Sequence, residues 1–382
     1  MKFSLFRQIL LSLLIITPPA WSQDTTAIDN EMRVAIDNFV GNPIPGISVA
    51  IANKDGALWS GAAGFSNIEE RQIISQSHLF GIGNITNQFV GTVILQMAND
   101  GLIDLDATPQ SILGDMVANI ENADSATLWQ LLTHNSGIYS WSDNQDWIRR
   151  GRGVQMNPKY IWRRDENLKY ATKDKHPAIH KAGDGYFYSK TNYTLLGLII
   201  EKISGGPIEI EIRSRIFEPL NLRSTFYDTY ETVTDGSLVG NYHFASNQFI
   251  KNVGINAKFQ FGDDQLINTS NASLSAEGIA GGMITTPRDL ARFAAMLWGG
   301  EILDDEQTKI IKPIMNDGQI GIHSEILGFT ADIRQIENSD LVIVSLVNLG
   351  TVNTGENEIN NRLTKYLDEI LIPIAKKYAQ VK

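Results

Sequence analysis

The sequence contains no cysteine, which excludes disulfide bonds, a thiol nucleophile, an iron–sulfur cluster and a lipidated N-terminal cysteine. Basic residues are also few, with 32 Lys and Arg against 43 Asp and Glu and a formal net charge of -11. Nonspecific nucleic-acid binding requires a basic surface to neutralise phosphates, so we expect no nucleic-acid partner. A chain of 382 residues without disulfides is nevertheless long enough to be stabilised by burial of apolar side chains alone.

The N-terminal apolar run, Ile9 to Ile16, is too short for a transmembrane anchor. It has less than half of the roughly 20 residues that a spanning helix needs. Two basic residues precede it, and two prolines and a small-residue cleavage pattern at Ala20 and Ser22 follow it. We therefore predict a secretory signal over residues 1–22 and a periplasmic or secreted mature protein over 23–382. Removal of the two basic residues changes the net charge from -11 to -13.

Hydrophobic periodicity predicts a mixed α/β fold of the α+β kind. The chain opens with β-branched stretches on either side of an Asp55-Gly56 turn, which is typical of a hairpin. Helical spacing then dominates until about residue 300, and two more strands and a terminal helix follow. This order predicts one antiparallel sheet built from both chain ends, about 45–80 and 300–382, with a helical subdomain inserted over about 81–299. The predicted helices span 84–100, 128–132, 193–203, 208–217, 287–298 and 356–378, and the late strands span 328–336 and 341–347.

The segment from Asp146 to Asp184 departs from the acidic composition of the chain. It holds ten Lys or Arg against five Asp or Glu, a local charge of +5. Two interpretations stay open: a solvated surface insertion, or a docking site for an anionic partner.

Three stretches carry a family resemblance. Residues 131–137 read LLTHNSG, residues 193–205 read YTLLGLIIEKISG, and residues 280–291 read AGGMITTPRDLA. In this order they resemble landmark segments of the class C type β-lactamases, D-alanyl-D-alanine carboxypeptidases, penicillin-binding proteins and related esterases. The resemblance extends from about Pro45 to Gly350. It implies a β-lactamase/transpeptidase-like fold and a family of serine hydrolases.

The first catalytic motif of that family is degenerate. In the family, a serine nucleophile and a lysine base are spaced S-x-x-K at the start of a helix, where positions i and i+3 share one face. The matching stretch here has Asn84 at the serine position and Asn87 at the lysine position. An amide is neither a practical nucleophile nor a base, although Asn84 is expected to cap the helix. No serine in the chain has a lysine three residues later, and no G-x-S-x-G elbow is present.

The second and third motifs are also altered. In the family's Y-x-N motif, Tyr188 matches the tyrosine and Lys190 takes the place of the asparagine. Lys190 either replaces the charge lost at Asn87, lowering the Tyr188 pKa or holding a carboxylate ligand, or it has drifted. In the third motif, K-T-G or H-x-G, His323 is kept and Glu325 stands at the glycine position, where a side chain would block substrate.

We expect no cofactor and no metal ion. His176 and His180 have a metal-like spacing, but Pro177 prevents a regular helix through the pair and no acidic third ligand is evident.

The concerted losses predict a protein without acyl-transfer activity, because losing the nucleophile or base of a serine hydrolase costs about a million-fold in rate. The first hypothesis is a noncatalytic binding or scaffold protein of the cell envelope. Its old cleft, where Asn84, Asn87, Tyr188, Lys190 and His323 converge, would hold a peptidoglycan-like peptide or another small molecule.

Two other hypotheses stay open. One is an enzyme of the β-lactamase, D-Ala-D-Ala carboxypeptidase or esterase type, with chemistry rebuilt around Tyr188, Lys190, His323 and Glu325. The other is a protein-interaction module that uses the basic segment 146–184.

Overall fold

The computed structural model describes residues 25–41, 43–253, 266–315, 318–355 and 358–381. The predicted signal segment, 1–22, lies outside these residues. Among the residues that are described, no helix is both long enough and apolar enough to cross a membrane.

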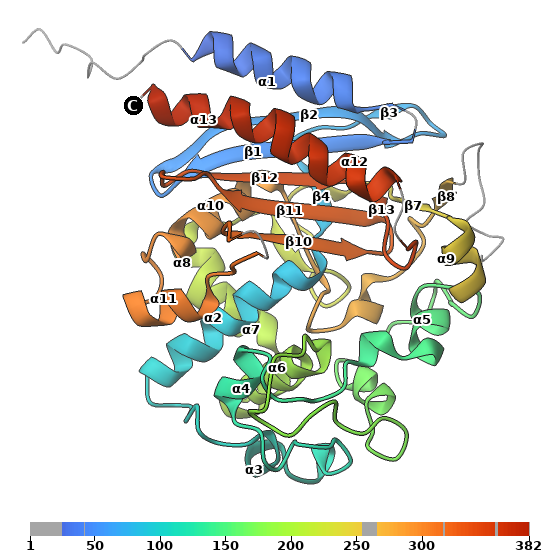
Figure 1. The fold of residues 1–382 in the computed structure, drawn as a ribbon, viewed down its shortest axis with the longest axis vertical. Helices are drawn as coiled ribbons and strands as arrows, with labels where there is room; N and C mark the ends of the chain where they lie inside the picture. Colours follow the sequence, from blue (N-terminus) through green and yellow to red (C-terminus); the bar gives the residue numbers. More distant parts are fainter. Residues whose placement is uncertain (1–24, 42, 254–265, 316–317, 356–357, 382) are drawn as a thin grey trace, which may run out of the picture.

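A six-stranded antiparallel sheet joins the two ends of the chain (Figure 1). Its strand order is β10-β11-β12-β1-β2-β3, so an early strand pairs directly with a late one. Ile47 of β1 lies opposite Val347 of β12, and the two strands stay in register over six pairs. The predicted mixed α/β fold, with one sheet assembled from both chain ends, is confirmed. The strands are β1 Gly46–Asn53, β2 Gly56–Asn67, β3 Gln72–Ile73, β10 Gly321–Ile326, β11 Phe329–Gln335 and β12 Val342–Val347.

The sheet separates two hydrophobic clusters because side chains alternate between the faces of a strand. Along β1, Ile47, Val49 and Ile51 belong to one cluster, whereas Ala50 and Ala52 belong to the other. Helices from both chain ends cover the first face, and the helical part of the chain covers the second (Figure 1). The covering helices of the first face are α1 Thr26–Phe39, α12 Glu358–Tyr366 and α13 Ile372–Gln380, with a π-helical segment at Leu367–Leu371 between the last two.

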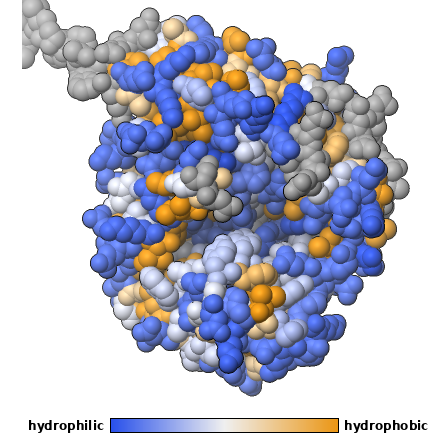
Figure 2. All heavy atoms as spheres, viewed as in Figure 1, coloured by the Kyte–Doolittle hydropathy of each residue, from blue (hydrophilic) through white to orange (hydrophobic). Residues whose placement is uncertain are grey.

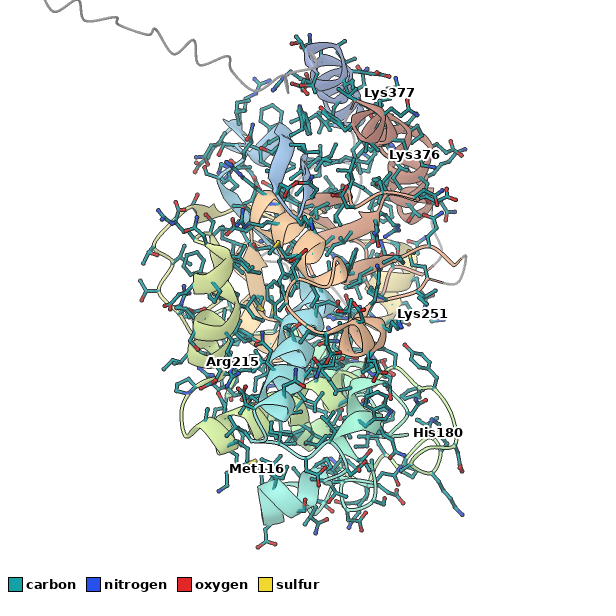
Figure 3. The ribbon with its side chains drawn as sticks, turned by 90° about the vertical axis from the view of Figure 1, so that its left-hand side faces the viewer. Met116, His180, Arg215, Lys251, Lys376 and Lys377 are labelled. Atoms are coloured by element: carbon teal, nitrogen blue, oxygen red, sulfur yellow. The ribbon has the colours of Figure 1, made fainter. Side chains whose placement is uncertain are left out.

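The two parts lie at opposite ends of the molecule. In Figure 3, Lys376 and Lys377 of α13 mark the end with the large sheet, whereas Met116 and His180 mark the helical end. The longest helices below the sheet are α2 Thr86–Asn99, α6 Lys190–Ser204 and α10 Pro287–Trp298. Shorter ones are α3 Pro109–Leu113, α4 Leu128–Leu132, α5 Gln145–Gly151, α7 Ile208–Ile212, α8 Glu218–Leu220, α9 Asn247–Asn252 and α11 Asp305–Ile311.

Two small sheets contain the other described strands, and a π-helical segment, Arg213–Phe217, follows α7. One has the order β13-β7-β8 and the other β5-β9-β4-β6. In the second of these, β4 leads directly into the turn that begins α2. The strands are β4 His78–Gly81, β5 Thr225–Tyr227, β6 Ser237–Leu238, β7 Tyr242–Phe244, β8 Leu266–Asn268, β9 Met283–Thr285 and β13 Leu349–Gly350.

The start of α2 differs from the prediction. A 3₁₀ turn over Gly83–Ile85 precedes the helix, and Ile85 occupies the N-cap position without a side-chain cap. Asn84 therefore lies inside the turn, and its Oδ1 makes no hydrogen bond among the described residues. The expected capping role of Asn84 is wrong, because the turn moves the helix start two residues downstream.

Candidate functional site

Asn87 and Tyr188 meet at the junction of the sheet part and the helical part. Asn87, in the first turn of α2, donates from Nδ2 to the Tyr188 hydroxyl at 3.3 Å. Tyr188 lies just before α6, two residues from its first residue, Lys190. Burial raises the pKa of Tyr188 well above its ordinary value, although the amides of Asn87 and Asn84 both oppose this shift. Tyr188 is therefore a neutral phenol, and the hypothesis that Lys190 lowers its pKa is wrong.

Two amide oxygens in this site have no partner among the described residues. They are Oδ1 of Asn84 and Oδ1 of Asn87, and both atoms are buried. Asn87 as a whole is 6% exposed. Because a buried carbonyl oxygen without a donor is costly, both atoms are suited to accept hydrogen bonds from a ligand.

Lys190 points to a carboxylate of the protein itself. Its Nζ lies 2.5 Å from Oε2 of Glu277, whose Oε1 accepts from the Arg152 guanidinium at 2.8 Å. The Lys190 ammonium also lies 5.5 Å from the ring centre of Trp141. Because the Lys190 ammonium is paired with Glu277, the interpretation in which it holds a ligand carboxylate is not supported.

The electrostatics of this ion cluster follow from its burial. Lys190, Arg152 and Glu277 expose 7%, 5% and 4% of their side chains. Burial alone would raise the pKa of Glu277, but the charges of Arg152 and Lys190 outweigh it and lower the pKa to about 2. Burial lowers the pKa of Lys190, and Glu277 opposes that shift.

His134, from the LLTHNSG stretch, packs beside Tyr188. The two ring centres are 4.6 Å apart, and His134 Nδ1 accepts from the backbone N–H of Ser189 at 3.2 Å. Burial lowers the pKa of His134 to about 4. A neutral, hydrogen-bonded imidazole in this place positions the Tyr188 loop.

The side chain of Ser324, in β10, is hydrogen-bonded to the backbone N–H of Asn84, the residue at the nucleophile position. Its Oγ accepts from the backbone N–H of Asn84 at 3.0 Å and donates to the carbonyl of Ile82 at 2.9 Å. In acyl transfer, such a backbone N–H at the nucleophile stabilises the oxyanion that forms on the substrate. Here that donor is already satisfied by the protein.

His323 and Glu325 lie on the other face of β10. Side chains alternate along a strand, so both point away from the face that carries Ser324. His323 Nδ1 lies 3.0 Å from Oδ1 of Asp332, and its Nε2 lies 3.2 Å from Oε1 of Glu325. Burial would lower the pKa of His323, but these carboxylates raise it to about 10. The predicted convergence of His323 with Asn84 is wrong, and the side chain at the oxyanion donor belongs to Ser324 instead of Glu325.

Half of the basic side chains in the segment 146–184 have acidic partners within the protein. Five of its ten basic side chains form ion pairs, four of them with carboxylates of buried or half-buried glutamates. The two histidines of the metal-like pair have different partners: His176 contacts Asn144, whereas His180 contacts the carbonyl of Lys181. Within the described ranges, no group of three or more potential metal ligands occurs.

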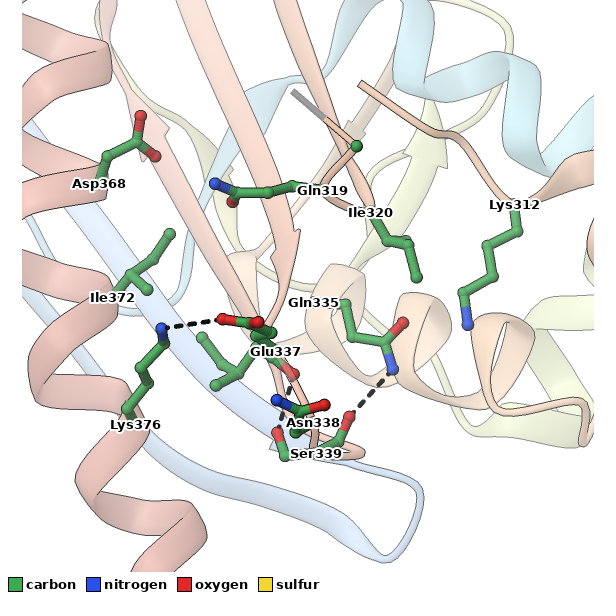
Figure 4. Close-up of a pocket in the computed structure, with 12 residues that line it drawn as sticks. Lys312, Gln319, Ile320, Gln335, Glu337, Asn338, Ser339, Asp368, Ile372 and Lys376 are labelled. Carbon is green, nitrogen blue, oxygen red and sulfur yellow. Dashed lines mark hydrogen bonds and ion pairs between the residues drawn. The ribbon is translucent and has the colours of Figure 1, made fainter. Parts of the chain in front are cut away.

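A hollow of about 820 Å³ lies elsewhere, where the turn between β11 and β12 faces α13 (Figure 4). Lys376 reaches Glu337 across it at 3.5 Å, and Gln335 donates to the carbonyl of Ser339 at 3.0 Å. None of the predicted site residues lines this hollow. Figure 2 shows a separate depression near the middle of the face in view, between the sheet part and the helical part.

Three residues of the site were not predicted. Side chains alternate along a strand, so Ser324 points inward once its neighbours, His323 and Glu325, are known to point outward. Arg152 and Glu277 are 125 positions apart in the sequence. No local pattern links them, and only the tertiary fold brings them to Lys190.

The chain resembles several characterised proteins. It is 24% identical to protein flp of Staphylococcus aureus (strain N315) over 208 residues, which are 53% of this chain and 40% of that protein. It is 24% identical to N-acetylmuramyl-L-alanine amidase of Bacillus subtilis (strain 168) over 234 residues, 56% of this chain and 50% of that protein. The matches thus span about half the length of these relatives or less.

Solved structures share the fold along most of the chain. D-amino acid amidase from Ochrobactrum anthropi SV3, in complex with D-phenylalanine, superposes with a TM-score of 0.74 at 21% identity, covering 92% of this chain and 99% of that one. The penicillin-binding protein homologue from Pyrococcus abyssi gives 0.68 at 20% identity, covering 91% and 77%. A family model described as Beta-lactamase matches residues 32–329. The chain therefore belongs to the β-lactamase family.

Proposed function

We propose that this protein is a noncatalytic, exported member of its family that binds a small ligand in the old cleft. The observation that carries the proposal is the contact of Ser324 with the backbone N–H of Asn84. This contact comes in addition to the replacement of the serine nucleophile by Asn84 and of the lysine base by Asn87. Nucleophile, base and oxyanion donor are then all unavailable for acyl transfer, and each change alone lowers the rate by orders of magnitude.

The unpartnered oxygens of Asn84 and Asn87 define the ligand chemistry that we propose. Both oxygens accept hydrogen bonds, and the N–H groups of a peptide or an amino acid amide are suitable donors. This agrees with an amide ligand better than with an anion, because Lys190 is held by Glu277. One structural relative was solved with L-phenylalanine amide bound, which is a ligand of the proposed class.

Rebuilt hydrolysis around Tyr188 and Lys190 has less support. A general base needs a pKa near the working pH, but burial raises that of Tyr188 and Lys190 is tied to Glu277. His323 and Glu325 face away from Asn84 and would not reach the same substrate. A docking role for the segment 146–184 is weakened because half of its basic side chains already have acidic partners.

Covalent labelling tests the loss of activity. We expect the purified mature chain, 23–382, to form no stable adduct with a fluorescent penicillin, and to turn over neither a chromogenic β-lactam nor a short-chain ester. Saturable turnover that Tyr188→Phe abolishes would contradict the proposal.

Calorimetric titration with N-acetyl-D-alanyl-D-alanine amide, an uncharged ligand of the proposed class, tests the binding role. We expect saturable binding that Asn87→Ala weakens about tenfold, the equivalent of one lost hydrogen bond of about 1.4 kcal/mol. The matched control is Asn361→Ala on the exposed side of α12, which should leave the affinity unchanged. An equal affinity of the Asn87→Ala protein would exclude the amide site.

A further inference from the structure

A second hollow, of about 770 Å³, lies between the β1–β2 turn and the N-terminal end of α10. Its lining includes Gly56 of that turn, Ser77 and Thr286, but none of the residues that surround Asn84. Ser77 precedes β4, and Asn84 follows the opposite end of the same strand. The hollow is therefore separate from the site of the proposed function.

Three arginines without acidic partners line this hollow. Arg223, Arg288 and Arg292 form no ion pair within 4.0 Å in the part of the chain that is described. Arg223 donates from Nε to the side chain of Asn221 at 2.8 Å, and Nε of Arg292 is buried with no hydrogen-bond partner there. Arg223 and Arg288 are exposed at the rim of the hollow, and Arg292 is half-buried. Unpaired guanidinium groups that converge on one hollow favour a bound anion.

The helix α10 adds to this preference. Its N-cap residue, Thr286, and the first residues, Pro287 and Arg288, line the same hollow. The positive end of the helix dipole attracts negative charge. In the first turn Pro287 has no N–H and Oγ1 of Thr286 accepts from the Asp289 N–H at 3.3 Å, so the backbone donor offered to a ligand there is the Arg288 N–H. Three guanidinium groups have more N–H donors than the two oxygens of one carboxylate can accept. The three terminal oxygens of a phosphate monoester match them better.

Three aspartates in the lining restrict the chemistry of the part of the ligand that does not contact the arginines. Asp235 accepts from the Ser224 hydroxyl at 2.7 Å, and Asp289 accepts from the Ser224 backbone N–H at 2.8 Å. Asp55, on the β1–β2 turn, lines the opposite side. These carboxylates repel an anion but accept hydrogen bonds from hydroxyl groups, so they match the uncharged portion of a hydroxylated molecule.

We propose that this hollow binds the phosphate ester of a small polyol. The arginines and the start of α10 hold the phosphate, and the carboxylates of Asp55 and Asp235 accept hydrogen bonds from the hydroxyl groups. The proposal is independent of the amide site at Asn87.

Calorimetric titrations of the mature chain with glycerol 3-phosphate, inorganic phosphate and glycerol test this proposal. We expect glycerol 3-phosphate to bind most tightly and glycerol not to bind. Arg292→Gln and Arg288→Gln should each weaken glycerol 3-phosphate about tenfold, because each removes one charge-assisted contact. Arg33→Gln, on an exposed position of α1, is the matched control and should leave the affinity unchanged.

Three results would overturn the proposal. One is the absence of saturable binding of glycerol 3-phosphate, and another is an equal loss in the Arg33→Gln control. The third is equal affinity for inorganic phosphate and glycerol 3-phosphate, which would refute the polyol contact. Arg288 is exposed, so its variant tests the site even where Arg292→Gln fails to fold. An Asn87→Ala protein should bind glycerol 3-phosphate normally, which separates this result from the fate of the amide site.

Discussion

Glu277 is the residue on which the buried charges of the old site depend. It is the shared acceptor of Lys190 and Arg152, and all three side chains are almost fully buried. We predict that Glu277→Gln lowers the free energy of unfolding by about 3–5 kcal/mol at neutral pH, since it leaves two buried cations without their counter-ion. Lys190→Met should cost less, because Arg152 continues to pair with Glu277. Urea unfolding followed by circular dichroism measures both.

The cost of Glu277→Gln should also depend on pH. The folded-state pKa of Glu277 is about 2, below its ordinary value, so its contribution to stability is present above about pH 4.5 and is lost as the pH falls toward 2. The difference from the wild type should therefore shrink below about pH 4. Glu301→Gln is the control, because Glu301 pairs with Lys54 at an exposed position. A difference that stays constant down to about pH 3 would contradict the buried ion cluster.

Single residues differ in how far the sequence reveals them. The amides at Asn84 and Asn87 are evident because they stand at fixed positions of a local motif. The contact of Lys190 with Glu277 depends on tertiary packing across 87 positions, so no sequence pattern reports it. His323 was placed in the cleft by its motif, but the alternation of β10 directs it to the other face.

At the scale of elements, the contact between β10 and the turn before α2 rests on Gly83. Its φ is 51°, and a Cβ added there would lie 2.5 Å from Oγ of Ser324. We predict that Gly83→Ala lowers the free energy of unfolding by about 2–4 kcal/mol, through the left-handed backbone and the steric conflict with Ser324. In the Gly83→Ala/Ser324→Gly double variant, the conflict with Ser324 should disappear, whereas the backbone cost of about 1 kcal/mol and the conflict with Cγ2 of Ile326, 2.8 Å from the added Cβ, should remain.

A double-mutant cycle of these two positions measures the coupling. Additive effects of Gly83→Ala and Ser324→Gly on the free energy of unfolding would show that the Ser324 side chain does not conflict with a Cβ at position 83. Gly101→Ala is a useful control for backbone conformation, since Gly101 has a φ of 71° and no atom within 4 Å of an added Cβ. It should show the backbone cost alone.

The elements themselves were predictable where a periodic pattern coincided with clear boundary residues. Helices α4 and α10 have the predicted bounds, because Thr127 and Thr286 cap them through their side chains. The C-terminal helix was predicted as one piece, but a π-helical segment at Leu367–Leu371 interrupts it. Such a bulge leaves the apolar periodicity almost intact, so the sequence alone does not indicate it.

At the scale of the whole molecule, the central sheet couples two cores that are distant in sequence. The C-terminal helices pack on one face through Leu371, which is fully buried, whereas the neighbouring Ile370 is 40% exposed. Leu371→Ala should lower the free energy of unfolding by about 2–5 kcal/mol, because it leaves a cavity in a packed core. Ile370→Ala, the adjacent control, should cost well under about 1 kcal/mol.

Native-state hydrogen exchange shows whether this loss is shared by the two cores. Strands β1 and β12 contribute side chains to both clusters, so the C-terminal face cannot open without weakening the sheet on which α10 packs. We therefore expect Leu371→Ala to speed exchange in α10 as well as in α13, with equal changes in free energy where global unfolding governs both. Faster exchange confined to α12 and α13 would mean that the C-terminal helices open as a separate unit. In that case the pairing of β1 with β12 would be stable without them, and the two chain ends would be joined by the sheet alone.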